Sequence, residues 1–468
     1  MPGRVFVASV LSPLRHRWRA DGGYRHVLAL ALPLILSTGS SSLQGFINRM
    51  FLIWSSPEAL AASMPAGILS FAILSIFINT SAYVGTFVAQ YHGAGQNTKV
   101  GPITWQAGVV ALAGALLSLL LIPAAPAFFA WVGHDPAVQV EEVTFFRILC
   151  LSAFPTVMAA AFSGMISGLG RTRTVMWVSL ATTAFNIALD YVLILGRLGV
   201  RPMGIAGAGW SAVVVSTVQA AIYVCIVCSR RYRDAYHTLD WRPDATMLRA
   251  LVRFGLPSGI QFFVDIGGFT AFILLVGRIG KNELAATNLA FNVNSIAFMP
   301  IVGLGIAVSV LVGQAMGRGE PEKARYRVRS AAHLTLTYMV LIAALFVLLP
   351  KLFLSPFAAA ADPEEFAAIG AIAVVLLRFV AVYTTFDGLN IVFSSAIKGA
   401  GDTRFVMVMI FCLSMGVLVV PSFAAIHWFG ASIYLCWSVA TAYVISLGLA
   451  FYLRYRSGVW TTMRVIER

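Results

Sequence analysis

Three acidic residues stand inside long apolar stretches, where an ionisable side chain is costly unless it is paired, solvated or neutralised. They are Asp190, Asp265 and Asp387, whereas the rest of the 19 Asp and Glu residues lie in polar segments or near the ends of apolar ones. Each of the three is therefore a candidate functional residue, with helix pairing or contact with trapped water as the structural alternative.

The surroundings of Asp265 and Asp387 suggest chemistry on a small cation. Tyr383 precedes Asp387 by four residues, so phenol and carboxylate share one face of a helix. Two carboxylates and a hydroxyl can coordinate Na⁺ through oxygen, or they can hold an exchangeable proton in a dry site. We predict a site for Na⁺ or H⁺ at Asp265, Asp387 and Tyr383.

Two further groups of polar residues recur at helical spacing. Asn186 precedes Asp190 by four residues and gives a second oxygen-bearing face. Asn288, Asn292 and Ser295 follow one another at i, i+4 and i+7, which predicts a polar stripe facing the interior of a helix bundle. This stripe either lines a pathway or bonds neighbouring helices to one another.

The composition indicates the elements that position these residues. Of 468 residues, 59% are hydrophobic and 11% are charged, with a mean hydropathy of +0.84, against about 45–50% and about 25% in a soluble chain. A membrane crossing needs about 20 apolar residues. The sequence predicts an all-α polytopic membrane protein with twelve transmembrane helices, near 28–54, 59–88, 103–131, 140–167, 173–196, 204–228, 249–277, 283–315, 328–354, 366–397, 405–429 and 432–453.

The net charge of +14 lies mostly in loops, which favours the positive-inside rule over a nucleic-acid partner. Both termini are therefore expected in the cytoplasm. The predicted inner side holds the N-terminus, Lys99, Arg171, Arg173, the stretches 230–253 and 318–329, Lys398, Arg404 and the tail after Arg454.

The chain contains an internal repeat. A shift of 224 residues places Pro33 on Pro257 and the pair Gly93 and Gly95 on Gly317 and Gly319, and a shift of 231 places 163–173 on 394–404. Parallel repeats are typical of transporters whose substrate path lies between the halves. The predicted division is a cytoplasmic segment 1–27, an N-lobe 28–228, a cytoplasmic linker 229–248, a C-lobe 249–455 and a tail 456–468.

An intramembrane aspartyl protease is the remote alternative, because two membrane aspartates are joined by a GAGD sequence at 399–402. However, Asp402 falls in a basic loop and its repeat counterpart is Arg171, so Gly399 and Gly401 are interpreted as turn residues and Asp402 as a loop acid. No G-x-x-x-x-G-K-[ST] loop is present, so ATP is not expected as the energy source. We expect an ion-driven transporter, not an enzyme, with no cofactor besides the coupling ion.

Several motifs together resemble the multidrug and toxic compound extrusion (MATE) family over nearly the whole chain. They are LALPLIL at Pro33, FGLPSGI at Pro257, FVAQYHGAG, VLVGQAMGRG, SGLGRTR, KGAGDTR and NIALDYVLILG. The resemblance implies two pseudo-symmetric six-helix bundles around a central cavity, in the inner membrane of a bacterium. It also implies a monomer that exports cationic, amphipathic compounds in exchange for Na⁺ or H⁺.

The resemblance also implies roles for single residues. In the NorM-like branch, an acid in helix seven and a Tyr and an Asp in helix ten match Asp265, Tyr383 and Asp387, although the first is usually Glu. Asn186 and Asp190 match a helix-five pair. The helix-one Asp of the family is here Asn48, and the helix-six Thr is replaced near Ala212. We expect the second-lobe site to be the principal one and the first-lobe site to be reduced.

Arginines within the apolar helices support one other transport function. Arg49, Arg147 and Arg378 would suit a flippase or exporter of a lipid-linked or anionic substrate in the same superfamily. Arg147 and Arg378 are equivalent in the repeat and also suit snorkelling or structural pairing. The acidic second-lobe site favours the cation antiporter.

Overall fold

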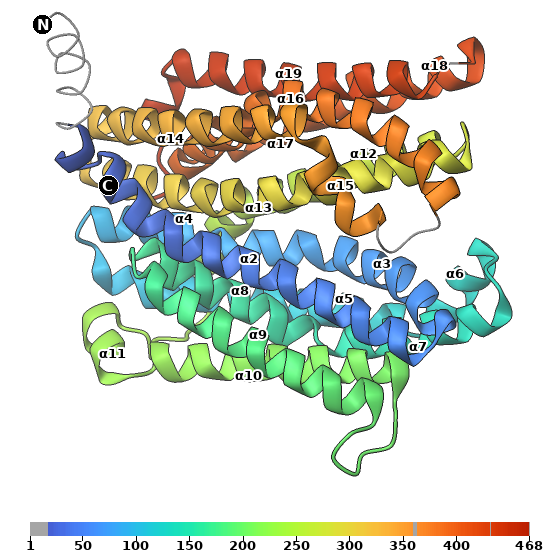
Figure 1. Ribbon diagram of the computed structural model, residues 1–468. Coiled ribbons are helices and arrows are strands. Elements are labelled where there is room, and N and C mark those ends of the chain that lie inside the picture. The colour runs from blue at the N-terminus through green and yellow to red at the C-terminus, as the bar shows by residue number, and fades with distance from the viewer. Residues whose placement is uncertain (1–16, 359–362, 431, 468) are drawn as a thin grey trace, which may run out of the picture. The chain divides into compact units, whose positions relative to one another are not determined.

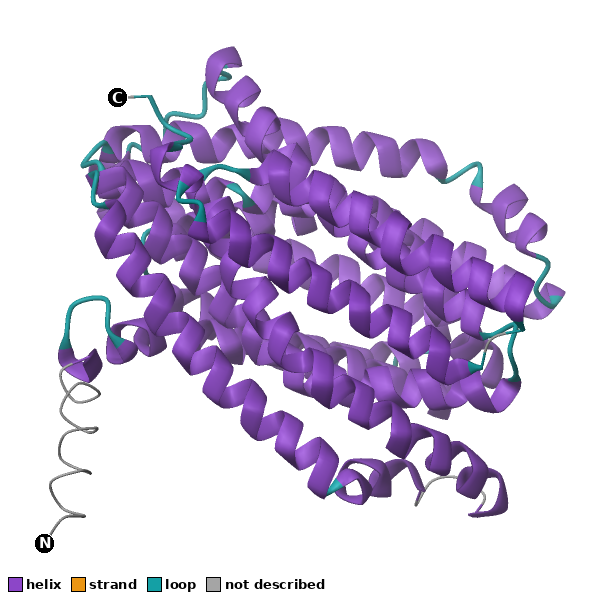
Figure 2. Cartoon of the chain, turned by 90° about the horizontal axis from the view of Figure 1, so that it is seen from above, coloured by secondary structure: helices purple, strands orange, loops and turns teal. Residues whose placement is uncertain are grey.

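The computed structural model describes residues 17–358, 363–430 and 432–467, so most of the predicted N-terminal segment lies outside the described residues. Within this part of the chain every regular element is a helix, and no strand occurs (Figures 1 and 2). A segment in hydrocarbon must satisfy its backbone hydrogen bonds internally, which a helix does.

Eleven helical segments are long and apolar enough to cross a membrane, or twelve if α7 and α8, bent by 49°, form one span. The prediction of an all-α polytopic membrane protein is thus confirmed. The spanning helices are α2 (Tyr24–Ser55), α3 (Pro57–Ala82) with α4 (Val84–Gly93), α5 (Val100–Leu121), α7 (Pro136–Leu151) with α8 (Ala153–Gly168), α9 (Thr172–Leu195), α10 (Gly204–Val227), α12 (Ala245–Val276), α13 (Lys281–Arg318), α14 (Pro321–Leu348), α16 (Pro363–Ala400), α17 (Thr403–Leu413) with η2 (Ser414–Val419) and α18 (Val420–Phe429), and α19 (Ile433–Arg456). Short helices α6 (Ala125–Val132), α11 (Arg230–Tyr236) and α15 (Pro350–Ala358), with single turns η1 (Asn97–Lys99) and η3 (Val459–Thr462), complete the chain.

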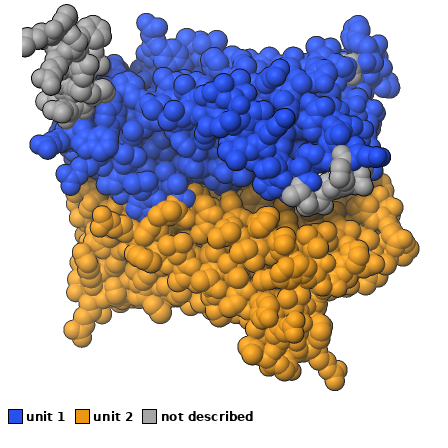
Figure 3. Space-filling view, viewed as in Figure 1, with its two compact units in different colours: residues 1–35, 264–463 blue, residues 36–263, 464–468 orange. Residues whose placement is uncertain are grey.

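The helices form two compact units, coloured separately in Figure 3. Unit 1 contains the described residues up to 35 together with 264–463, and unit 2 contains 36–263 with the last residues of the chain. These bounds differ from the predicted lobes because α2 begins in unit 1 and ends in unit 2, whereas α12 begins in unit 2 and ends in unit 1. The functional division into an N-lobe and a C-lobe stays a prediction.

The first part of α2 belongs to unit 1 and the first part of α12 belongs to unit 2, and glycines allow both to pack tightly there. A Cβ added to Gly303 of α13 would lie 2.7 Å from the backbone nitrogen of Ile35 in α2, within unit 1. A Cβ added to Gly255 of α12 would lie 2.7 Å from the carbonyl oxygen of Thr80 in α3, within unit 2. Only glycine permits such backbone approaches, so these contacts hold each helix start in its unit.

The backbone reproduces the sequence repeat. Gly95 and its equivalent Gly319 have φ angles of 75° and 76°, and Gly170 and its equivalent Gly401 also have positive φ. Gly399 was expected to be a turn residue, but it lies inside the last turn of α16. A Cβ there would lie 2.7 Å from the carbonyl oxygen of Ser309, so Gly399 serves helix packing instead.

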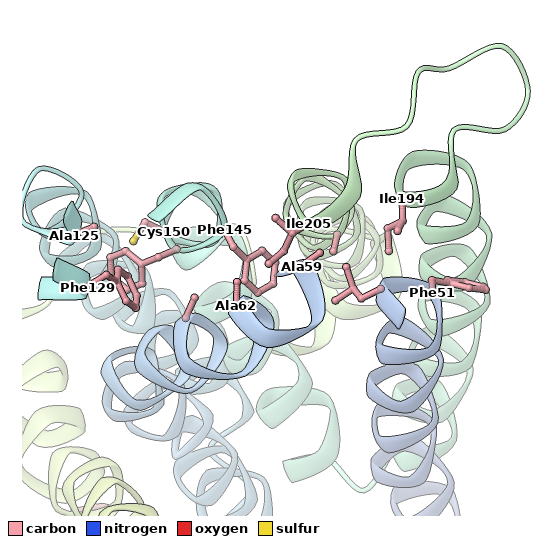
Figure 4. Packing of buried hydrophobic residues seen from close by; sticks show 13 residues of the cluster. Phe51, Ala59, Ala62, Ala125, Phe129, Phe145, Cys150, Ile194 and Ile205 are labelled. Carbon is pink, nitrogen blue, oxygen red and sulfur yellow. The ribbon is translucent and has the colours of Figure 1, made fainter. Parts of the chain in front are cut away.

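Unit 2 has a hydrophobic cluster at one end of its helices, shown in Figure 4. Small alanines of α3, such as Ala59 and Ala62, pack among larger side chains from α2, α7 and α10, including Phe51, Phe145 and Ile205. Ile194 of α9 belongs to the same cluster, one helical turn after Asp190. The cluster therefore fixes the part of α9 that carries this acid.

The predicted linker, 229–248, is an ordered part of unit 2 that contains α11. The Arg171 guanidinium lies over the rings of Tyr232 and Tyr236, 4.5 Å and 5.5 Å from their centroids. Trp105 Nε1 donates a hydrogen bond of 2.7 Å to the carbonyl oxygen of Thr238. Cation–π contacts and this hydrogen bond hold the segment against α5 and the turn before α9.

Candidate functional site

Unit 1 brings the two predicted carboxylates of the second lobe into one electrostatic cluster. Asp265 on α12 and Asp387 on α16 interact electrostatically, and Tyr383 interacts with Asp387 from one helical turn away. The Tyr443 hydroxyl donates a hydrogen bond of 3.2 Å to Asp265 Oδ1. Asn390 Nδ2 donates a long one of 3.4 Å to Asp387 Oδ1. Two carboxylates with few donors form an acidic centre suited to a cation or a proton.

Sequence reasoning missed Tyr443 and Asn390 and did not connect Lys398 with the acids. Tyr443 gives no signal in the sequence, because a lone tyrosine in an apolar helix is common. Asn390 follows Asp387 by three residues and could have been recognised as sharing its face. Lys398 was predicted to lie on the inner side; it stands in the last turn of α16 and interacts electrostatically with Asp265.

Aromatic rings border the acidic centre. Phe269, one turn after Asp265, lies 5.9 Å from the rings of both Tyr443 and Phe291. Phe291 stacks on Trp437 at 5.2 Å, and Trp437 is fully buried. These rings exclude water from one side of the carboxylates, which strengthens every electrostatic interaction there.

A π-helical segment, η2, approaches α12 beside the acidic centre. A Cβ added to Gly268, three residues after Asp265, would overlap the Ser414 hydroxyl at the start of η2. Interruptions of this kind inside long helices occur frequently at functional sites. The glycine permits the close approach of a non-uniform helix to the candidate site.

Unit 2 assembles the predicted first-lobe residues. Asn48 Nδ2 of α2 donates a hydrogen bond of 3.1 Å to Asp190 Oδ2 of α9. Asn186 Nδ2 donates one of 2.9 Å to the hydroxyl of Ser211 on α10. The helix-six Thr was expected to be replaced near Ala212, and the adjacent Ser211 provides a hydroxyl at this point of α10.

The first-lobe cluster contains two acceptor oxygens without donors. Asp190 is 0% exposed and Asn186 is 2% exposed, and neither Asp190 Oδ1 nor Asn186 Oδ1 has a hydrogen-bond partner among the described residues. A buried acceptor left unpaired costs about 1–3 kcal/mol. A cation, a proton or a water molecule at this point would remove that cost.

The polar stripe on α13 is exposed instead of packed between helices. Asn288, Asn292 and Ser295 are all exposed. Asn292 Nδ2 and the Ser295 hydroxyl donate hydrogen bonds of 2.8 Å to carbonyl oxygens of their own helix, at Asn288 and Phe291. The alternative in which the stripe bonds neighbouring helices gains no support, and its role in lining a pathway stays a prediction.

The other charged residues singled out from the sequence show no ion pair with Asp265 or Asp387 among the described residues. Arg49, Arg147 and Arg378 are exposed, and none of them pairs with an acid in the described part of the chain. Asp402 precedes the first residue of α17, and its carboxylate accepts hydrogen bonds from Arg454 Nη2 at 2.8 Å and Nε at 2.9 Å instead of capping the helix. A carboxylate clamped in this way is structural.

Comparison with known proteins decides the family. A family model described as MatE matches residues 33–192 and 257–423, two stretches that start at the repeat-equivalent Pro33 and Pro257. The chain belongs to the MatE family.

Relatives and structures similar to this MatE chain agree with that assignment. The chain is 33% identical to the "Probable multidrug resistance protein NorM" of Pseudomonas putida over 388 residues, 81% of this chain and 82% of the relative. It is 28% identical to the "Multidrug resistance protein PmpM" of Pseudomonas aeruginosa over 408 residues, 85% of this chain and 83% of the relative. A solved structure titled "Outward-facing conformation of a multidrug resistance MATE family transporter of the MOP superfamily" matches with a TM-score of 0.85, 18% identity, and coverage of 94% and 97% of the two chains. This last likeness shows the shared fold.

Membership in the MatE family makes the chain a multi-pass membrane transporter instead of an enzyme. The resemblance inferred from the sequence motifs is confirmed, and the protease alternative is excluded. The salt bridge between Asp402 and Arg454 gives the physical reason, because it explains the GAGD sequence without catalysis.

Proposed function

We propose that this MatE transporter exports cationic, amphipathic small molecules in exchange for Na⁺ or H⁺ by alternating access. The observation that carries the proposal is the acidic centre of unit 1, where Asp265 and Asp387 interact beside a wall of aromatic rings. Two carboxylates in a dry environment repel each other, so binding a proton, Na⁺ or an organic cation lowers the free energy of the site.

Competition for the same carboxylates supplies the coupling. An ion or a substrate shifts a conformational equilibrium only if it binds one state better than the other. A monovalent cation bound between Asp265 and Asp387 in one state cancels one of their two negative charges, so a second cation is held less tightly and binding of the coupling ion promotes release of the drug. The Tyr443 hydroxyl orients the Asp265 carboxylate for this exchange.

We propose a second, weaker ion site in unit 2. The unpaired oxygens of Asp190 and Asn186 support it, because a small cation accepts such oxygens as ligands. Asn48 replaces the acid expected in helix one and donates a hydrogen bond to Asp190. The site therefore has one negative charge instead of two, which weakens its attraction for Na⁺.

The membrane orientation also belongs to the proposal. Basic residues of the predicted inner side lie at the ends of α13, α14 and α19, as at Arg318 and Arg456. By the positive-inside rule we propose that both termini lie in the cytoplasm. We also propose that the protein is a monomer in the inner membrane of a bacterium, and the bacterial relatives support this membrane.

Transport in proteoliposomes tests the function. We expect purified protein to move a fluorescent organic cation when a Na⁺ or a proton gradient is imposed, and to stop when the gradient is collapsed with an ionophore. The Asp265→Asn/Asp387→Asn double variant is the control, because it keeps the volume of both side chains and removes both charges. Transport that proceeds equally without either gradient, or equally in the double variant, would contradict the proposal.

A further inference from the structure

Unit 1 contains a cavity of about 290 Å³ that the transport site does not use. It lies where the N-terminal part of α14 meets the last turns of α19 and the C-terminal part of α16. The residues that matter in its lining are Arg329, His333, Phe393, Tyr452, Tyr455 and Arg456.

The charge of the cavity is positive. Arg329 and Arg456 are exposed at its rim, and neither pairs with an acidic side chain in the described part of the chain. Two neighbouring basic residues, in contrast, each pair with an acidic side chain. Arg325 pairs with Glu322 at 2.6 Å, and Arg454 pairs with Asp402 at 2.8 Å. The two rim guanidiniums are therefore available to an external anion.

Aromatic rings make the inner wall of the cavity. The Phe393 ring lies 5.4 Å from that of Tyr452 and 4.9 Å from that of Tyr455. Tyr455 in turn stacks on Trp460 at 5.3 Å, and its hydroxyl donates a hydrogen bond to the carbonyl oxygen of Arg325. These contacts fix the rings, so the wall exists before any ligand binds.

We propose that this cavity binds the phosphate headgroup of an anionic phospholipid. Guanidinium groups match phosphate oxygens in a two-pronged geometry, and aromatic residues concentrate at the depth of lipid headgroups. Basic pockets between transmembrane helices on the cytoplasmic side provide the same chemistry. The site is separate from the proposed cation exchange and does not depend on the transported substrate.

Exposed apolar side chains provide a path for the acyl chains. On α14, Leu336 and Val340 follow His333 by three and seven residues and are both exposed. On α19, Leu453 and Leu449 precede Arg456 by three and seven residues and are also exposed. Both pairs continue from the cavity along one helix face. This continuity favours a lipid over a free anion such as inorganic phosphate.

Native mass spectrometry of the full chain tests the site. The protein, purified in detergent, is mixed with phosphatidylglycerol or with phosphatidylcholine, and the lipid-bound fraction is measured. We expect preferential binding of phosphatidylglycerol by the wild type. In the Arg329→Gln/Arg456→Gln variant we expect this preference to fall roughly 10-fold or more. Both arginines are exposed, so their loss leaves the packed helices unchanged.

The Arg325→Gln variant is the control for the α14 half of this change, because it removes one positive charge from α14, one turn before Arg329 and outside the cavity. It should keep the wild-type preference. Equal preference in wild type and double variant would overturn the proposal. So would a thermal stabilisation by inorganic phosphate that matches the one by phosphatidylglycerol, since this would identify a soluble anion as the ligand.

Discussion

The Tyr443 hydroxyl donates a hydrogen bond of 3.2 Å to Asp265 Oδ1 and thereby joins α19 to α12. Tyr443 is fully buried, and its ring lies 5.9 Å from that of Phe269. A buried donor on a carboxylate fixes the direction in which the remaining oxygen points. The contact makes a residue of the last helix part of the proposed exchange site.

Replacing Tyr443 with Phe should weaken coupling between the ion and transport while the protein still folds. The ring keeps its packing, but Asp265 loses a hydrogen bond worth about 1.5–3 kcal/mol to a charged group. We expect the half-saturating concentration of the coupling ion to change by about 10-fold, measured from transport rates in proteoliposomes. Tyr434→Phe, on the exposed side of the same helix, is the control. An unchanged ion dependence in Tyr443→Phe would show that the hydroxyl only anchors α19.

Single substitutions of the two carboxylates should separate coupling from folding. Asp265→Asn and Asp387→Asn are each expected to abolish coupled export while the protein still folds, because each charge is costly to bury. Asp402→Asn should instead lower thermal stability, because it removes the partner of Arg454, and leave transport by the folded protein unchanged. Size-exclusion profiles, melting temperatures and transport rates of the three variants test both halves of this expectation.

Adding a carboxylate to the first-lobe cluster should make transport depend more strongly on pH. Asn48→Asp would replace the amide that donates to Asp190 Oδ2 with a second carboxylate. Two carboxylates at this distance share a proton, because they cannot both remain ionised in a dry site. We expect the transport rate of Asn48→Asp to vary more steeply with pH near neutrality than that of the wild type. A lowered melting temperature with an unchanged pH profile would instead show a purely structural cluster.

The equivalent glycines Gly168 and Gly399 should be equally intolerant of a methyl group. Each faces backbone of its own unit, at Gly85 and Ser309. Alanine there forces the helices apart, at a cost of about 1–3 kcal/mol. Gly45→Ala is the control, since a Cβ at Gly45 meets nothing within 4 Å. Thermal unfolding in detergent should show a lower midpoint for Gly168→Ala and Gly399→Ala and no decrease for Gly45→Ala.

Hydropathy and charge were enough to predict the spans and the acids of both candidate sites, and matched residues such as Pro33 and Pro257 were enough to predict the repeat. An acid such as Asp265 inside an apolar run is rare and costly, so its position alone carries information. The partners could not be predicted in the same way. Ser211 and Tyr443 are ordinary residues of apolar helices, and their roles depend on how each helix is rotated in the bundle. The interaction of Lys398 with Asp265 likewise depends on how α12 and α16 pack.

The sequence also could not predict that the first part of α2 belongs to unit 1 and the first part of α12 to unit 2. Gly303 and Ile35 are far apart in the sequence, and neither stands out by type or spacing. Their contact arises from packing within unit 1, which local patterns do not record. Sequence patterns report which side of a helix is apolar, but they do not identify the distant segment that covers it.

The shared helices α2 and α12 have a consequence for biosynthesis. Unit 2 needs residues of α12 up to 263, so it cannot be completed when the ribosome has made only the first six spans. Unit 1 needs the start of α2, which is synthesised long before its partners on α13. One face of α2 therefore stays uncovered in the bilayer until α13 has been synthesised. Neither unit can complete its packing before the other has begun to form.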